Sequence, residues 1–255
     1  LTTSRTYALL VDPTGSPDCS AGTWASGCRQ VTVQNVVDYA NLQFPSSATI
    51  CAGGTFTAYG QVYEPGVTEA AGAGAGITVE FGYSSSNTDP SGGGWTWTSS
   101  GVSFNVQSGN NDEYKIVFGS SLAAGTYYYT FRYSMGGGCW RYGGFNGGFW
   151  NGTSNVNGTL TVNALPAITT QPSSPTALCG AGTRSFTVVA IGTGLSYQWE
   201  VSTNAGSSWS TVSNGGVYSG ATSATLTITN PPGTMNGYQY RVIVSGTCTP
   251  SVTSN

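Results

Sequence analysis

A two-residue alternation of apolar and polar side chains recurs along most of this sequence, and clusters of Gly, Asn and Ser interrupt it at short intervals. The clearest runs are 77–83, with Ile, Val, Phe and Tyr at alternate positions, and 127–133, with Tyr, Tyr, Phe and Tyr. Such alternation places one set of side chains on each face of a strand. Because no stretch shows the period of an amphipathic helix, the pattern predicts an all-β chain of antiparallel sandwiches.

Composition excludes several classes of function. Histidine is absent from the 255 residues, which removes His-based catalytic triads and His metal ligands, so we expect no catalytic residue, no metal and no cofactor. The net charge is −3 and Lys115 is the single lysine, so the chain has no basic surface for nucleic acid. The apolar runs are short, which argues against insertion into a membrane.

The sequence divides into three segments. Three prolines lie in 163–175, between two blocks of alternating strands, so we place a boundary near Ala164. We predict a first β-sandwich over 37–163 and a second over 164–255. Residues 1–36 contain two β-prone runs joined by a loop, which predicts a small N-terminal β-hairpin. Because an isolated hairpin is marginally stable, we expect it to pack on a neighbouring sheet or on another molecule.

The second block carries marks of an immunoglobulin-like sandwich. Tyr238 follows Gly237 at the start of a late strand and resembles the tyrosine corner of that fold, with Trp199 as its core tryptophan. Tyr240 stands where antibody domains have their second cysteine, so we expect this sandwich to hold without the usual buried bridge. We also expect Trp209 to lie in the core.

The cysteines indicate an oxidising, extracytoplasmic compartment. There is no C-x-x-C spacing and no histidine, so the cysteines are predicted to form disulfides and not to bind metal. Cys19 and Cys28 lie in a Gly/Ser-rich loop, and their closeness in the sequence predicts a local bridge. The cysteines are Cys19, Cys28, Cys51, Cys139, Cys179 and Cys248.

The other four cysteines leave two kinds of pairing open. The two blocks repeat a motif, ICAGG in the first and LCGAG in the second, and this repetition suggests bridges within each domain, Cys51–Cys139 and Cys179–Cys248. In immunoglobulin topology, however, these positions lie at opposite ends of a sandwich, whereas a disulfide needs Cα atoms within about 7 Å. Pairing between the domains therefore remains an alternative.

The second block ends without an equivalent of the strand at 159–162, which closes the first block. We predict that the second sandwich lacks its last strand, and an open sheet edge invites the addition of a strand. Either the sequence is a piece of a longer protein, or a strand of another copy fills the gap, as in donor-strand polymers. The donor-strand candidate consists of Thr6, Tyr7, Ala8, Leu9, Leu10 and Val11.

Aromatic side chains provide the main candidate for a ligand-binding surface. They gather among glycines in 136–152, where they either stack on sugars or on a partner's apolar ridge, or bury one another at the end of the sandwich. Trp95 and Trp97 share one face of a strand, and the alternation nearby favours a core position over an external platform. The candidate residues are Trp95, Trp97, Trp140, Arg141, Tyr142, Phe145 and Trp150.

One acidic segment invites a metal hypothesis. Asp112 and Glu113 follow Asn110 and Asn111, and together they carry oxygen ligands of the kind that calcium prefers. The D-x-D-x-D-G spacing is absent, so we interpret this segment as a polar turn.

Several motifs resemble those of a known group of proteins. YQWEVSTN at 197–204, YSGA at 218–221 and NGYQYRV at 236–242 resemble the immunoglobulin-like repeats of Bacteroidota surface proteins. QVYEPGVT at 61–68 and GTYYY at 125–129 are similar to another module of that phylum, which accompanies secreted proteins exported by the type IX system. The resemblance implies export, surface attachment, and adhesion or scaffolding, with other surface proteins, a second copy or glycans as partners.

These observations favour a non-enzymatic, extracellular structural or adhesive segment of a secreted or surface-anchored bacterial protein. One alternative is a pair of carbohydrate-binding accessory modules of a secreted enzyme. A second alternative is a filament subunit that is completed by donor-strand exchange.

Overall fold

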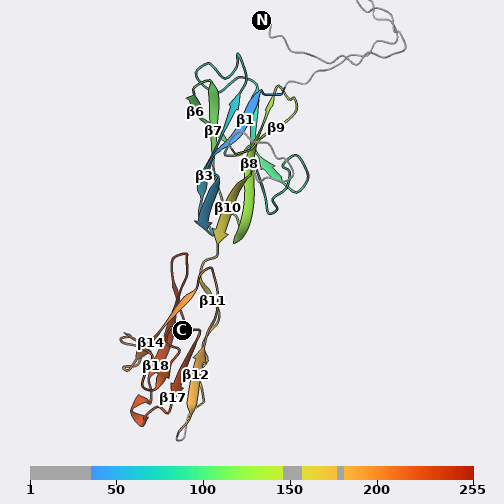
Figure 1. The fold of residues 1–255 in the computed structure, drawn as a ribbon. Helices are drawn as coiled ribbons and strands as arrows, with labels where there is room; N and C mark the ends of the chain where they lie inside the picture. The colour runs from blue at the N-terminus through green and yellow to red at the C-terminus, as the bar shows by residue number, and fades with distance from the viewer. Residues whose placement is uncertain (1–35, 146–156, 177–180) are drawn as a thin grey trace, which may run out of the picture. The chain divides into compact units, whose positions relative to one another are not determined.

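The computed structural model describes residues 36–145, 157–176 and 181–255, which lie in one compact unit, Asn35–Asn255. The predicted N-terminal hairpin lies outside the described residues. The described elements are strands, apart from one short 3-10 turn, η1 (Gly233–Met235). Figure 1 shows them as two groups of strands, β1–β10 and β11–β19.

The first group forms a sandwich of two sheets. One sheet has the order β1-β3-β7-β6, and the other has the order β2-β10-β8-β4-β5, with β9 paired to β8. The strands of the first sheet are β1 (Tyr39–Phe44), β3 (Phe56–Tyr63), β7 (Asn111–Phe118) and β6 (Ser103–Ser108). Those of the second are β2 (Ser47–Cys51), β10 (Gly158–Asn163), β8 (Gly125–Met135), β4 (Ile77–Ser84), β5 (Thr96–Thr98) and β9 (Arg141–Gly143).

The core of the first sandwich follows from the alternation in β4 and β8. Phe81, Phe131 and Tyr133 are fully buried, and the rings of Phe81 and Phe131 meet edge to face with centroids 5.3 Å apart. Tyr129 is also buried and lies 4.9 Å from the ring of Phe56 on the opposite sheet. The core is therefore a network of aromatic rings that come from both sheets.

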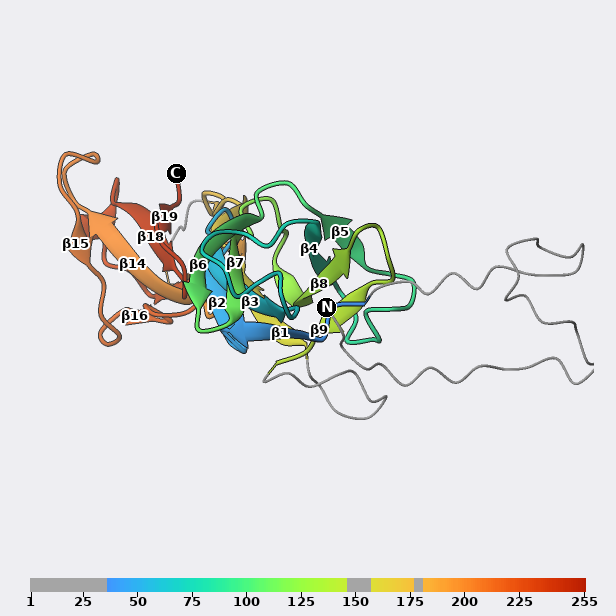
Figure 2. The same cartoon turned by 90° about the horizontal axis from the view of Figure 1, so that it is seen from above.

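The second group forms a smaller sandwich. Its largest sheet has the order β15-β14-β18-β19, whose strands lie side by side in Figure 2. The other sheets have the orders β12-β17-β16 and β11-β13. The strands are β11 (Ala167–Thr170), β12 (Thr183–Thr187), β13 (Val189–Ile191), β14 (Ser196–Ser202), β15 (Ser210–Thr211), β16 (Tyr218–Ser219), β17 (Thr225–Thr229), β18 (Gln239–Ser245) and β19 (Val252–Thr253).

Trp199 is the centre of the second core. Its ring is fully buried, and its Nε1 donates a hydrogen bond to the Ser223 carbonyl oxygen at 2.8 Å. Phe186 of β12 packs against it, and the ring of Phe186 lies 5.0 Å from that of Tyr240 on β18. The contact between the rings of Phe186 and Tyr240 thus occupies the place where antibody domains have a buried disulfide bridge. The predicted all-β class, with tandem antiparallel immunoglobulin-like sandwiches, is confirmed for the described residues.

The second sandwich has a short last strand, so the prediction that it lacks one is corrected. β19 pairs antiparallel with β18, with Thr253 opposite Ile243. The pairing continues at Ser254, whose N–H donates to the Val242 carbonyl and whose Oγ accepts from the Val242 N–H, both at 2.9 Å. Two residues are too few for an alternation to be recognised in the sequence, which is why this strand was not expected.

A disulfide joins Cys51, the last residue of β2, to Cys248 in the loop between β18 and β19, with the two Cα atoms 5.8 Å apart. β2 pairs with β10 in parallel, and this register sets Cys51 opposite Asn163, where β10 ends. The Ala52 N–H donates to the Asn163 carbonyl oxygen at 2.9 Å. Cys51 therefore lies at the point where the chain leaves the first sandwich.

Cys248 is held at the same point by the second sandwich. The Thr247 N–H donates to the Thr193 carbonyl at 2.8 Å, and the Thr193 N–H donates to the Ala164 carbonyl at 3.2 Å. These bonds place the loop that carries Cys248 beside the residues that follow β10. The Cys248 sulfur lies 3.8 Å from the Asn163 carbonyl oxygen.

The predicted bridges Cys51–Cys139 and Cys179–Cys248 are therefore wrong, and the alternative of a bridge between the domains is the one that the structure contains. The physical reason is that the parallel pairing of β2 with β10 places Cys51 at the end of the first sandwich that leads into the second. Cys248 is therefore within bonding distance of Cys51. Cys139 is exposed in the loop between β8 and β9. The predicted Cys19–Cys28 bridge lies outside the described residues.

Candidate functional site

The outer face of the β2-β10-β8-β4-β5 sheet carries the candidate aromatic residues. Trp97 of β5 lies opposite Gly82 of β4, whereas the core residue Phe81 lies opposite Thr98. Because side chains alternate along a strand, Trp97 faces away from the core. The expectation that Trp97 is internal is therefore wrong. A Cβ atom at position 82 would lie 2.5 Å from the Trp97 ring, so the glycine provides the flat surface on which this ring rests.

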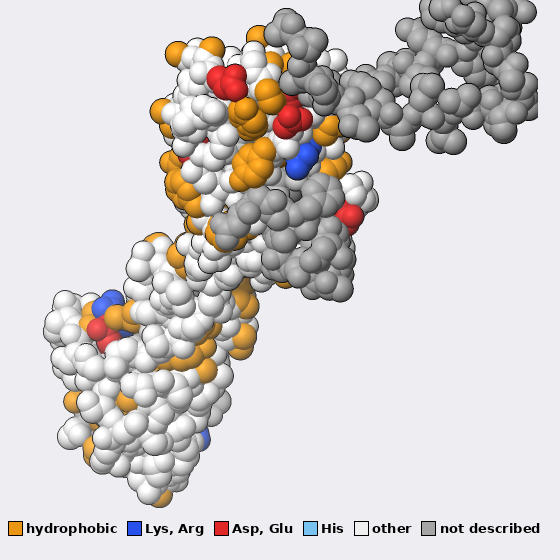
Figure 3. Space-filling model, turned by 45° about the horizontal axis from the view of Figure 1, so that its top comes forward, with side chains coloured by type: hydrophobic (Ala, Val, Ile, Leu, Met, Phe, Trp, Pro, Cys, Tyr) orange, Lys and Arg blue, Asp and Glu red, His pale blue; other side chains and the backbone are white. Residues whose placement is uncertain are grey.

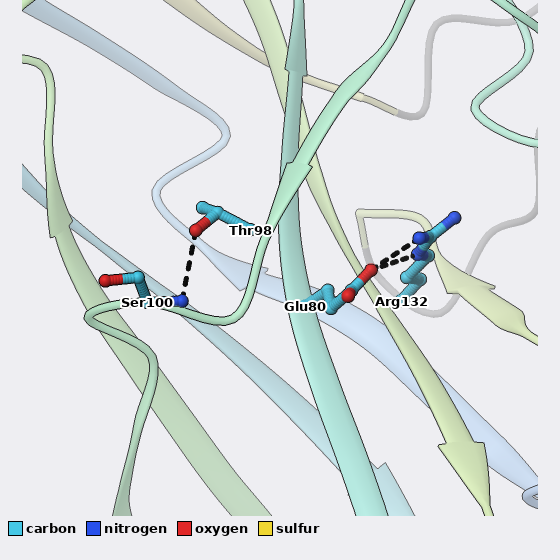
Figure 4. A network of polar contacts seen from close by, with 4 residues as sticks. All are labelled: Glu80, Thr98, Ser100 and Arg132. Atoms are coloured by element: carbon cyan, nitrogen blue, oxygen red, sulfur yellow. Dashed lines mark hydrogen bonds and ion pairs between the residues drawn. The ribbon is translucent and has the colours of Figure 1, made fainter. Parts of the chain in front are cut away.

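Arg132 of β8 organises this face. Its guanidinium carbon lies 4.2 Å from the ring centroid of Trp97 and 4.2 Å from that of Trp140, which gives it two cation–π contacts. Its Nε and Nη2 donate to Oε2 of Glu80 at 2.7 and 2.5 Å, as the dashed lines of Figure 4 show. The ion pair is half-buried, and it compensates the charge of the guanidinium that the two rings partly cover.

The end of β5 is fixed by a local turn. The Ser100 N–H donates to Oγ1 of Thr98 at 3.0 Å, directly after the strand that carries Trp97 (Figure 4). A side-chain hydrogen bond of this kind favours a turn over continued strand. The turn thus marks the end of β5 directly after Thr98.

Two further rings complete the face. Trp95 stacks on Trp97 with centroids 5.7 Å apart and an interplanar angle of 23°. Tyr142 of β9 meets Trp97 edge to face at 5.6 Å and 61°, so the rings do not share one plane. All of these side chains are half-buried. We call the set the outer aromatic cluster; it consists of Trp95, Trp97, Arg132, Trp140 and Tyr142.

The remaining candidate residues are placed elsewhere or are not described. Arg141 lies opposite Tyr133, and its Nη1 donates to the Val37 carbonyl at 3.4 Å. Phe145 forms an isolated bridge with Leu42 of β1. Trp150 lies outside the described residues. The structure thus brings together four of the seven candidates and separates two from them.

Sequence reasoning missed Glu80 and Arg132. Each is a charged residue at an outward position within an otherwise alternating strand, and the two lie directly opposite each other across β4 and β8. Opposite charges in two strands of the same block were the signal that could have found them.

The second sandwich repeats this arrangement with one tryptophan. Arg241 of β18 lies opposite Glu200 of β14, and its Nε donates to Oε2 of Glu200 at 2.7 Å. The guanidinium carbon lies 4.3 Å from the ring centroid of Trp209. Trp209 therefore packs over Arg241 and is not part of the core cluster, so that expectation is wrong. Elsewhere the surface is sparsely charged, as Figure 3 shows for one face.

An open groove of about 840 Å³ lies in the second sandwich and was not expected from the sequence. Aromatic and proline side chains make up about half of its lining, and the rest includes polar residues such as Ser174, Arg184 and Gln239. The walls include Pro172, Pro175, Phe186, Trp209, Pro231, Pro232, Met235, Tyr238 and Tyr240.

Asp112 is buried within β7, so the interpretation of this segment as a polar turn is wrong. Its Oδ2 accepts a hydrogen bond from the Gly74 N–H at 2.6 Å, and burial raises the pKa of the carboxyl group. Glu113 accepts from Nδ2 of Asn105. Within the described residues, no group of three or more His, Cys, Asp or Glu could hold a metal ion.

The described part of the chain contains no helix long and apolar enough to cross a membrane. No protein-family model and no curated protein matches the chain.

Solved structures that resemble the chain are built from immunoglobulin domains. An I-band fragment of titin has 13% identity and a TM-score of 0.46, and the match covers 85% of this chain and 63% of the fragment. The N-terminal eight immunoglobulin domains of Down Syndrome Cell Adhesion Molecule have 13% identity and a TM-score of 0.46, and the match covers 85% of this chain and 24% of that one. A two-domain fragment of DIP-gamma has 15% identity and a TM-score of 0.42, and the match covers 86% of this chain and 92% of the fragment. At these identities the likeness carries nothing about function, and the fold rests on the strand order described above.

Proposed function

We propose that this chain is a non-enzymatic, extracellular structural and adhesive segment of a secreted or surface-anchored bacterial protein. The observation that carries the proposal is the Cys51–Cys248 bridge, which ties one immunoglobulin-like sandwich to the next. Disulfides persist in oxidising compartments outside the cytoplasm, so the bridge supports an extracellular location. Two sandwiches tied together in this way suit a protein that spaces or holds other domains.

The surface composition supports an adhesive role. Charged residues make up 7% of the chain, against about 25% in soluble proteins on average, and glycine, serine, threonine and asparagine fill much of the rest. Such a surface has little long-range electrostatic attraction for arbitrary partners. The resemblance to Bacteroidota surface proteins that leave the cell by the type IX system supports the same location. Its partners would be other surface proteins, a second copy, or glycans.

The adhesive role is tested by displaying the chain on the outer surface of a host bacterium that lacks adhesins. Displaying cells are expected to aggregate, or to attach to cells of a Bacteroidota species, and soluble chain is expected to block this attachment by competition. Host cells that display an unrelated protein of equal size are the control. Attachment no greater than that of the control would overturn the adhesive part of the proposal.

A second candidate function is the binding of carbohydrate, and the outer aromatic cluster is the observation that favours it. Trp95 is half-buried and stacks on Trp97 at the outer face of the sheet, where the Trp95 ring can contact sugars. A polysaccharide array probed with the wild type and with Trp95→Ala tests this function. Trp209→Ala, which removes the outer tryptophan of the other sandwich, is the matched control. Equal signals from all three proteins, or no signal, would remove this candidate.

A further inference from the structure

One covalent bond joins two positions that are 197 residues apart, and this determines which part of the chain can be stretched. We propose that the Cys51–Cys248 bridge makes the two sandwiches an inextensible link, because tension along the backbone passes through the bond and cannot extend residues 52–247. The inference deepens the structural part of the proposed function and rests on it.

The covalent path explains the effect. Tension applied at the two ends of the chain reaches Cys51 from one side and Cys248 from the other. The disulfide connects these residues directly, so 52–247 form a closed loop that begins and ends at the same bond. Pulling on that bond cannot lengthen the loop. The strands from β3 to β18, which contain most of both cores, therefore cannot be extended along the backbone while the bond holds.

Without the bridge the load path is different. Tension would leave β2, run through β3 to β10, continue along 164–166 and enter the second sandwich. Both sandwiches would then unfold in series, because the described residues of each are held by non-covalent contacts: hydrogen bonds, an ion pair and side-chain packing. The bridge replaces this path with one bond.

The strands outside the loop are the ones that meet the load. β1 and β2 precede Cys51, and β19 follows Cys248. β2 is paired with β10 over its whole length, from Ser47 opposite Thr159 to Cys51 opposite Asn163. Leu42 of β1 is fully buried in the core. These contacts resist the removal of β1 and β2, and among the described residues only the segments before Cys51 and after Cys248 can extend.

The environment of the bridge favours its persistence. Cys248 is 1% exposed, and the loop that carries it is hydrogen-bonded to Thr193. A reductant attacks a disulfide sulfur directly. Cys248 is buried and Cys51 is partly buried, so the fold restricts the approach of a reductant to the Cys51 side of the bond.

The experiment pulls the whole 255-residue chain by handles at its two ends in an optical trap. The oxidised wild type is expected to release about 650–710 Å less contour length than Cys51→Ser/Cys248→Ser, because 197 residues at about 3.3–3.6 Å each stay locked. Thr49→Ser, an exposed position in β2, is the matched control and should behave as the wild type. Since contour length is measured on the extended chain, the comparison holds even if the double variant folds poorly.

A wild type that releases the same contour length as the double variant would overturn the inference, as would full unfolding steps from both sandwiches under oxidising conditions. The outcome is separate from that of the display experiment. A locked chain that fails to attach cells would leave the inference standing and remove the adhesive role. A chain that attaches cells but extends fully would leave the adhesive role standing and overturn the inference about the bridge.

Discussion

The two sandwiches share a Glu–Arg–Trp arrangement on an outer face, but their cores are constructed differently. In the first sandwich the fully or almost fully buried rings are Tyr129, Phe131, Tyr133 and Phe81, and they contact one another across β4 and β8. Among the described residues of the second, Trp199 is the one ring buried completely. Removing one ring from the first core leaves the other buried rings in contact with one another. Removing Trp199 from the second core leaves a cavity at the position that its neighbours pack against.

The largest expected effect comes from Trp199→Ala. Truncation of a buried tryptophan costs about 3–5 kcal/mol, and here it also removes the donor to the Ser223 carbonyl. We expect the second sandwich to unfold while the first stays folded. Hydrogen exchange measured along the chain should show lost protection in β14, β17 and β18 and retained protection in β7 and β8.

Trp199→Phe is the control for this variant. It keeps an aromatic ring and removes the indole N–H, so we expect a smaller loss of about 1–2 kcal/mol. Equal loss of protection in both sandwiches after Trp199→Ala would show that the cores are one cooperative unit and would contradict the comparison.

Gly82→Ala tests the outer face of the first sandwich. The added methyl group would lie 2.5 Å from the Trp97 ring, so the ring must move off its position beside Arg132. We expect a destabilisation of about 1–3 kcal/mol, as for other overpacked sites, and a changed near-UV circular dichroism of the Trp95–Trp97 pair. Gly93→Ala, which has open space around it, should change neither signal.

The two ion pairs are expected to differ in strength. Arg132 makes two hydrogen bonds to Glu80 and contacts two tryptophan rings, whereas Arg241 makes one bond to Glu200 and contacts one ring. We expect Glu80→Gln to cost about 1 kcal/mol and Glu200→Gln about 0.5 kcal/mol in urea denaturation. A larger loss from Glu200→Gln would reverse the ranking of the two faces.

The smallest expected effect concerns Asp112. Burial raises the pKa of its carboxyl group above the ordinary value of 3.8, so ionisation disfavours the folded state. The stability that the protonated form contributes is complete below the ordinary pKa and is lost as pH rises through the raised pKa. Asp112→Asn keeps an acceptor for the Gly74 N–H and does not ionise. We expect it to raise the melting temperature at pH 7, with the difference shrinking toward about pH 4.

A second readout belongs to the same variant. Burial, and then the charge of Asp112, raise the pKa of Tyr114 to about 12. Removing the carboxylate should therefore lower the pKa of Tyr114 in a spectroscopic titration. An unchanged melting temperature at pH 7 together with an unchanged Tyr114 pKa would show that Asp112 is not ionised in the folded protein at neutral pH.

The sequence was sufficient for the fold class and for the central residue of the second core, Trp199. The alternation at 77–83 and 127–133 became β4 and β8, with the expected side chains in the core. Trp199 was placed correctly because the tyrosine-corner pattern marks the neighbouring strand. Both predictions depend on local periodicity, which a single sequence displays directly.

The candidate site depended on information that is not local. Whether Trp97 faces inward or outward is decided by the register of β5 against β4, and only the opposite residue, Gly82, makes the outward position favourable. Trp209 was misplaced for the same reason, because its partner Arg241 lies on another strand. The pairing of Cys51 with Cys248 required the parallel β2–β10 register and the loop around Thr193, which no spacing of cysteines displays.

Disulfide mapping tests the central claim, that a bridge ties the two sandwiches together. The seven arginine and lysine residues divide the four cysteines among separate tryptic peptides, with Cys51 in 30–115, Cys139 in 133–141, Cys179 in 142–184 and Cys248 in 242–255. After digestion without reduction, mass spectrometry should detect 30–115 joined to 242–255. Detection of 30–115 joined to 133–141, with 142–184 joined to 242–255, would contradict the claim.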